Sequence, residues 1–330
     1  MSEVTERSGI DAERRAGAVR GVFGTLRDGT VVEKAVLRNA AGMTAEVIGW
    51  GAALRVLSVP DRDGWFDDVV LGYDTLEEYV SQPEFFGATV GRFANRIAGG
   101  RFELDGRSCS VPATDGPNAL HGGEHGFDKR CWTLASLSGP GEMPAARFRR
   151  TSPAGEEGFP GTLLVEAGYE LGPDNTLVLD YRAETDAATV VNVCNHTYFN
   201  LGGDSSGMTA LDHLVAIHAD GFVPVDAGAI PTGEIRPVSG TAFDFRSAMR
   251  VCDRIRDGGD PQIRLGRGYD HTFVLRGGTT ATPKPAARVV EPNSGRLLEI
   301  STTEPGVQFY SGNFLNGTRR GKGGWMYRQG

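Results

Sequence analysis

The chain of 330 residues is long enough for one large domain or two smaller ones, and 39% hydrophobic with 23% charged residues is typical of a globular protein. A formal net charge of −8 and a pI near 5.4 disfavour nucleic acid and anionic membranes as partners, because both attract clustered positive charge. No apolar run approaches the ~20 residues that span a bilayer, so no membrane partner is expected.

Residues 1–21 are polar and lack the apolar core of a secretory signal. They are predicted to form a disordered leader on a cytoplasmic protein, and residues 22–330 are predicted to be the folded domain. The cysteines are widely separated and include no C-x-x-C pair, which indicates small, reduced core residues: Cys109, Cys131, Cys194 and Cys252.

Along the chain, short apolar runs alternate with turn residues, and 47 glycines punctuate them, which is typical of an all-β protein. Strands separated by Ala-Gly and Gly-Ala turns are expected within residues 33–61. In residues 102–111, Asp105-Gly106 lies between two strand-like flanks and strongly favours a hairpin. Residues 176–185 alternate with period two, as a strand does.

Only residues 75–81 and 245–255 favour short helices. One large β-sandwich is therefore the predicted architecture, and two domains joined near residue 150 are the alternative.

The stretch HGGEHG contains His121, Glu124 and His125 in the H-x-x-E-H pattern of inverted zinc peptidases. Zinc binding would need a helix, because two histidines four residues apart share a face only there. Gly122 and Gly123 would each cost a helix about 0.8–1.0 kcal/mol relative to alanine. No metal is therefore expected, and a glycine-rich loop with incidental histidines fits the local sequence better.

Residues 190–201, VVNVCNHTYFNL, alternate between apolar and polar side chains. On a strand this would give a mostly apolar back and a front that carries Asn192, Cys194, His196, Tyr198 and Asn200. Such a front is typical of the wall of a polar pocket. A buried hydrogen-bonded network or a wet outer face fits equally well.

Three other polar positions interrupt strand-like runs. Asn95 and Arg96 precede a Gly-Gly turn, where a guanidinium could bind an oxygen-rich ligand or form a salt bridge that holds the turn. Asp270 opens an apolar strand, where a carboxylate could accept hydrogen bonds from hydroxyl groups or cap a turn. Glu304 begins a Glu-Pro-Gly turn ahead of another strand.

Together these segments resemble the aldose 1-epimerase, or galactose mutarotase, family. The matching stretches occur in the family's order from about residue 22 to 324: FGTLRDG, VPDRDG, VVLGYDTLEEY, FFGATVGRFANRIAGGRFELDG, NALHGGEHGFDKRCW, NHTYFNLGG, YDHTFVL, TTEPGVQFYSGNFL and RGKGG. The resemblance implies a large β-sandwich of the galactose-mutarotase type. It also implies an enzyme that interconverts the α and β anomers of free hexoses such as galactose and glucose, with no metal or redox cofactor.

Opening a pyranose ring requires one proton delivered to the ring oxygen and another removed from the anomeric hydroxyl. Histidine suits the acid role, because its unperturbed pKa lies near neutrality. By motif position, the resemblance makes His196 the proton donor. It implies that the sugar is held by His121, Asn95, Arg96, Tyr198 and Asp270, and that Glu304 falls where the family has a polar side chain near the sugar.

The family's general base is a glutamate that follows the RGKGG-like stretch, and the residues after that stretch here, WMYRQG, do not include it. We therefore expect the family's last segment to lie beyond residue 330. In that case this chain would lack the general base and would be inactive. It would also have an unpaired sheet edge, and we expect it to be a monomer or a homodimer. The alternatives are that Glu304 serves as the base, that the protein is a non-catalytic sugar-binding module, or that it is a hexose-6-phosphate 1-epimerase with a further cationic cluster.

Overall fold

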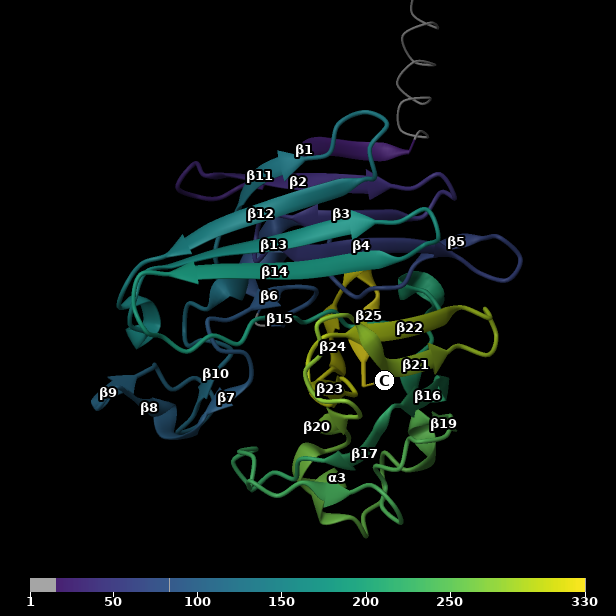
Figure 1. The fold of residues 1–330 in the computed structure, drawn as a ribbon. Coiled ribbons are helices and arrows are strands. Elements are labelled where there is room, and N and C mark those ends of the chain that lie inside the picture. Colours follow the sequence, from purple (N-terminus) through teal and green to yellow (C-terminus); the bar gives the residue numbers. More distant parts are fainter. Residues whose placement is uncertain (1–15, 83, 330) are drawn as a thin grey trace, which may run out of the picture. The chain divides into compact units, whose positions relative to one another are not determined.

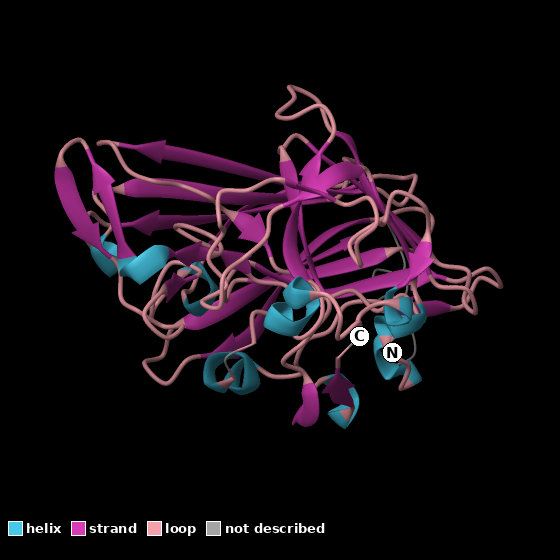
Figure 2. Cartoon of the chain, turned by 90° about the horizontal axis from the view of Figure 1, so that it is seen from below, coloured by secondary structure: helices cyan, strands magenta, loops and turns pink. Residues whose placement is uncertain are grey.

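The computed structural model describes residues 16–82 and 84–329, which are built mainly of strands (Figure 1). The chain divides into two compact units. Unit 1 comprises residues 1–59 and 66–198, and unit 2 comprises residues 60–65 and 199–330. Within the described residues there are two α-helices, α2 (Leu76–Ser81) and α3 (Pro261–Gly266), and both are short. Single helical turns lie between many of the strands (Figure 2).

Unit 1 contains two large sheets. The first has five strands in chain order: β1 (Gly17–Thr25), β2 (Val31–Arg38), β3 (Thr44–Ile48), β4 (Ala53–Pro60) and β5 (Phe66–Asp68). The second has four antiparallel strands, also in chain order: β11 (Thr133–Leu137), β12 (Ala145–Ser152), β13 (Leu163–Leu171) and β14 (Leu177–Thr185).

The two sheets pack face to face, with β2 against β11, β12 and β13 (Figure 1). Alternation along the strands turns Leu37 and Val47 of one sheet and Phe148 and Val165 of the other inward, and all four are fully buried. The hydroxyl of Tyr169 on β13 donates to the backbone oxygen of Ala52 at 2.7 Å. Unit 1 is thus built around a β-sandwich, and the predicted all-β class is confirmed.

Short two-stranded pairs connect the sheets of unit 1. They are β6 (Thr89–Val90) with β15 (Cys194–Asn195), β7 (Arg96–Ile97) with β10 (Ala119–Leu120), and β8 (Arg101–Leu104) with β9 (Arg107–Ser110). Strands β6 and β7 are close to one another along the chain, but their partners β15 and β10 are far apart in sequence. The first two pairs therefore bring the segments around β10 and β15 near one another.

Unit 2 contains two four-stranded sheets and a hairpin. The strand orders are β19 (Met249–Arg250), β16 (Leu214–Ile217), β21 (Lys284–Val290), β22 (Leu297–Thr302) in one sheet, and β18 (Arg236–Pro237), β17 (Ala219–Phe222), β20 (Asp270–Leu275), β23 (Gly306–Tyr310) in the other; the hairpin is β24 (Asn316–Arg320) with β25 (Met326–Arg328). An aromatic core fills this unit, in which the rings of Phe222 and Phe243 stack at 4.2 Å.

Several local predictions are confirmed. Asp105 and Gly106 form the two-residue turn between β8 and β9, with φ of 50° and 73°. The predicted helix at 75–81 is α2, which begins with a capping box between Thr75 and Glu78. The runs within 33–61 form β2, β3 and β4, and the run at 176–185 forms β14.

Other local predictions are wrong. Residues 245–255 contain β19 and a single 3-10 turn instead of an α-helix. Within 190–201 only Cys194–Asn195 is a strand, and residues 193–199 are all half-buried, so the predicted apolar back does not form. The predicted leader falls mostly outside the described residues, but its last part, from Gly17, belongs to β1.

Among the described residues, no helix is both long and apolar enough to cross a bilayer. The four cysteines are free thiols, but none is fully buried and Cys252 is exposed, so their predicted role as core residues is wrong.

Candidate active site

Two strand pairs in unit 1 bring His121 and His196 together. His196 follows β15 and lies beside β6, where its backbone N–H donates to the oxygen of Ala88 at 2.8 Å. His121 follows β10 and lies beside β7, where its N–H donates to the oxygen of Asn95 at 3.0 Å. The centroids of the two imidazole rings are 5.0 Å apart, and the ring planes are nearly perpendicular at 88°.

The imidazole of His121 has one defined tautomer. Its Nδ1 accepts a hydrogen bond from the backbone N–H of Asn95 at 3.1 Å, so the proton of the neutral ring is on Nε2. Burial lowers the pKa of His121 well below its usual value, and the positive charges of Arg96 and Lys129, together with that of His196 when it is protonated, lower it further. His121 is therefore a neutral hydrogen-bond donor through Nε2.

Burial also lowers the pKa of His196 to about 4, because an imidazolium loses its hydration there. The ring lies 5.2 Å from that of Tyr198, which in turn packs against Phe86 at 4.9 Å. The expectation that the proposed acid titrates near neutrality is thus wrong for the free protein, in which His196 is neutral at pH 7.

Asn95 and Arg96 lie at the start of β7, next to His121. Asn95 has a positive φ of 67°, which aims its N–H at His121. The Nε of Arg96 donates to the carboxylate of Asp115 at 2.6 Å, and its side chain is only 12% exposed. The salt bridge that sequence reasoning raised as the alternative therefore forms.

Two of the predicted residues belong to unit 2. Asp270 opens β20, and its carboxylate accepts a hydrogen bond from Gln308 Nε2 at 2.8 Å. Glu304 is exposed in the turn between β22 and β23, where its backbone oxygen accepts from Lys284 Nζ at 2.6 Å. Unit 1 brings the other five together: Asn95, Arg96, His121, His196 and Tyr198.

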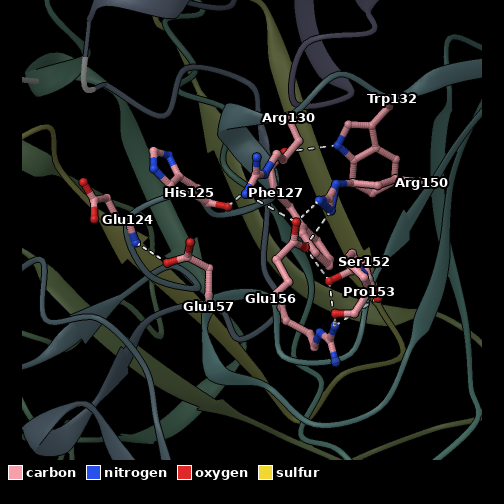
Figure 3. Close-up of polar contacts among 11 residues, drawn as sticks. Glu124, His125, Phe127, Arg130, Trp132, Arg150, Ser152, Pro153, Glu156 and Glu157 are labelled. Atoms are coloured by element: carbon pink, nitrogen blue, oxygen red, sulfur yellow. Dashed lines mark hydrogen bonds and ion pairs between the residues drawn. The ribbon is translucent and has the colours of Figure 1, made fainter.

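The H-x-x-E-H stretch forms turns, as predicted, and is not a helix. His125 is exposed, and its backbone oxygen accepts from Arg130 Nε at 3.3 Å (Figure 3). The two histidines of the pattern therefore differ: one contacts His196, and the other lies on the surface of the loop.

The family model for aldose 1-epimerase matches residues 33–329 of this sequence, which include parts of both units. The chain belongs to the aldose 1-epimerase family. The resemblance seen in the sequence motifs is thereby confirmed.

Relatives within the aldose 1-epimerase family are similar over most of their length. The chain is 46% identical over 309 residues to the galactose mutarotase of Sus scrofa, covering 93% of this chain and 86% of the relative. It is 40% identical over 291 residues to the aldose 1-epimerase of Escherichia coli strain K12, covering 88% and 82%. The solved galactose 1-epimerase from Lactobacillus acidophilus NCFM superimposes with a TM-score of 0.82 at 32% identity, covering 92% of this chain and 86% of that one.

This epimerase-family chain also contains a residue at the site that sequence reasoning missed. Phe85 lies against both histidines, with ring centroids 4.6 Å from His121 and 5.4 Å from His196, and the ammonium group of Lys129 lies 5.9 Å from its ring centre. It helps to exclude water from the imidazoles. In the sequence, the signal for this close packing is the aromatic pair Phe85-Phe86 followed directly by a glycine. In the structure that glycine, Gly87, has a φ of 67°.

A buried arginine anchors the segment that carries Asn95 in this aldose 1-epimerase family member. Arg92 is 2% exposed. Its guanidinium donates to four backbone oxygens and two hydroxyls, those of Ser152, Pro153, Pro160, Gly161 and Thr189. These contacts tie the segment before β7 to the β12–β13 connection, and so fix the backbone that meets His121.

Proposed function

We propose that the protein is an aldose 1-epimerase that interconverts the α and β anomers of free hexoses by acid/base ring opening and closure. The observation that carries this proposal is the contact between two neutral, half-buried imidazoles of unit 1, His121 and His196. The 46% identity to a galactose mutarotase supports galactose as a substrate.

Ring opening moves one proton onto the ring oxygen and takes another from the anomeric hydroxyl, and the Glu304 carboxylate is the candidate acceptor of that second proton among the predicted site residues. Rotation about the C1–C2 bond and the reverse transfers then yield the other anomer, so the sugar neither gains nor loses atoms or electrons. We assign His196 as the proton donor to the ring oxygen. His121 would donate a hydrogen bond from Nε2 to a sugar oxygen, since its Nδ1 is already occupied by Asn95.

The remaining predicted residues are proposed to hold sugar hydroxyls: Asn95, Arg96, Tyr198, Asp270 and Glu304. The last two are assigned on their motif positions alone. The four free thiols are compatible with a reducing compartment, which supports the proposed cytoplasmic location.

Polarimetry tests the proposal. The chain should accelerate the change in optical rotation of freshly dissolved α-D-galactose or α-D-glucose above the spontaneous rate. His196→Asn should abolish most of this acceleration and leave sugar binding, measured by calorimetry, nearly intact. His125→Asn is the control, because this histidine lies in the loop of His121 but is exposed, and it should behave as wild type.

Two results would contradict the proposal. A folded chain that binds galactose without accelerating mutarotation would be a sugar-binding module. Equal losses of kcat and of binding in His196→Asn would remove His196 from the proton-donor role. Glu304→Gln tests the alternative general base, because a loss confined to kcat would assign proton removal to that carboxylate.

A further inference from the structure

The loop that carries His121 has an unusual backbone. His121, Gly122 and Gly123 have φ of 50°, 92° and 103°, so three successive residues lie in the left-handed region. A methyl group on Gly122 would overlap the backbone oxygen of Gly91, and one on Gly123 would overlap the carboxylate of Glu157. The glycine loop, residues 121–126, is therefore packed directly against its neighbours, and these neighbours maintain its conformation.

One of these contacts comes from a side chain distant in sequence. Glu157 Oε2 accepts a hydrogen bond from the backbone N–H of Glu124 at 2.7 Å, as Figure 3 shows. A carboxylate that accepts from a backbone N–H forms a charge-assisted hydrogen bond, which is stronger than a neutral one. Glu157 thus fixes the glycine loop three residues after His121.

The residue next to Glu157 anchors the same turn to the interior. Glu156 forms a bidentate ion pair with Arg150 and accepts from the hydroxyl of Ser152, and Arg130 Nη2 lies 3.3 Å from its carboxylate (Figure 3). The side chains of Arg150 and Glu156 are only 7% and 12% exposed. Two adjacent glutamates therefore have different contacts: Glu156 anchors the turn in the sheet, and Glu157 reaches outward to the glycine loop.

We propose that Glu157 is a positioning residue for His121, because its hydrogen bond to the Glu124 N–H holds the glycine loop where the imidazole meets the Asn95 N–H. Without it, the loop can relax, and the ring loses the contact that keeps its proton on Nε2. This inference rests on the proposed function in one respect, namely that His121 binds the sugar.

Three substitutions at one position separate the hydrogen bond from charge and volume. Glu157→Ala removes the acceptor, and Glu157→Asp keeps the charge but is one methylene too short to reach. Both should lower kcat/KM for mutarotation by about tenfold or more, since small misplacements of binding groups are costly. Glu157→Gln keeps an acceptor oxygen at the same reach and should stay within about threefold of wild type.

Glu142→Ala is the matched control. Glu142 Oε2 also accepts from a backbone N–H, that of Gly139 at 2.6 Å, in the turn between β11 and β12. Losing the same kind of contact away from the glycine loop should leave kcat/KM at the wild-type value.

A spectroscopic measurement tests the proposal independently of turnover. In the ¹⁵N-histidine-labelled protein, with His121 assigned from the spectrum of His121→Asn, wild type and Glu157→Gln should show an unprotonated Nδ1 and a protonated Nε2. Glu157→Ala and Glu157→Asp should show averaging between the two tautomers. If the wild-type chain accelerates no mutarotation, the proposed function fails, and these spectra alone decide the role of Glu157.

Unchanged His121 nitrogen signals in Glu157→Ala or Glu157→Asp would overturn the proposal. It would also be overturned if Glu157→Gln lost as much kcat/KM as Glu157→Ala, or if Glu142→Ala lost as much as either. Should Glu157→Ala not fold, Glu157→Asp, which retains the charge, provides the same comparison.

Discussion

The charge state of His196 predicts an unusual pH profile. An ordinary histidine has a pKa of about 6.5, whereas burial lowers the pKa of His196 to about 4 and that of His121 well below its usual value. Neither imidazole at the site therefore titrates between pH 5.5 and 7.5. The kcat/KM for mutarotation reports the ionisation of the free enzyme, so its profile should show no bend near pH 6.5.

The expected magnitudes separate the two cases clearly. A group with pKa 6.5 changes from about 90% to about 10% protonated between pH 5.5 and 7.5, so that log kcat/KM bends in mid-range. With a pKa of about 4, the neutral fraction stays above about 95%, while the protonated fraction falls about a hundredfold without levelling. A straight rise toward low pH identifies the imidazolium as the proton donor, and a flat line identifies the neutral ring as the working form.

Polarimetry from pH 5.5 to 7.5 provides the assay, with the spontaneous rate subtracted at each pH and folding checked by circular dichroism. His196→Asn is measured alongside. A bend near pH 6.5 in the wild type that disappears in His196→Asn would refute the reasoning, because it would show that burial does not keep this imidazole neutral.

Other buried groups predict effects on stability and binding. His271 is fully buried and its pKa is lowered to about 4 by burial, so the fold favours the neutral ring and loses stability as the pH falls from about 6.5 through 4. In urea denaturation, the free energy of unfolding of the wild type should fall by about 2 kcal/mol more than that of His271→Gln between pH 7 and 5; an equal fall in both proteins would contradict this. Glu156→Ala leaves the Arg150 guanidinium buried and unpaired and should cost about 3 kcal/mol of unfolding free energy by urea titration; a loss below about 1 kcal/mol, as for an exposed pair, would contradict this. Asp270→Asn keeps the contact with Gln308 but removes the charge, so KM for galactose should rise about tenfold in polarimetry with kcat little changed; an unchanged KM would place Asp270 outside the binding site.

The elements that the sequence predicted correctly are those set by local chemistry. Asp105-Gly106 can adopt positive φ, so the turn between β8 and β9 follows from two residues. The capping box of Thr75 and Glu78 likewise determines where α2 begins. Helix α3 was missed although Asp260 caps it and Pro261 occupies its first turn, which is a start signal that sequence reasoning did not use.

The parts that were missed depend on contacts across long stretches of chain. Residues 190–201 were interpreted as a strand because they alternate. Among the described residues, however, the segment forms a strand only at Cys194–Asn195, beside an isolated bridge from Asn192 to Phe93. The roles of Phe85 and Glu157 depend on what faces them, His121 in one case and the Glu124 N–H in the other. Motif positions identified His121 and His196 but carried no information about how far burial lowers their pKa values.

The guanidinium of Arg92 has a consequence for the order in which the protein folds. Its acceptors lie between 60 and 97 residues further along the chain, at Ser152 and Thr189 respectively. Closing such long loops is slow compared with forming a two-residue hairpin such as that between β8 and β9. The segment that carries Asn95 therefore reaches its final place only after the β12–β13 connection has arrived, and the contact between Asn95 and His121 should be among the last parts of unit 1 to form.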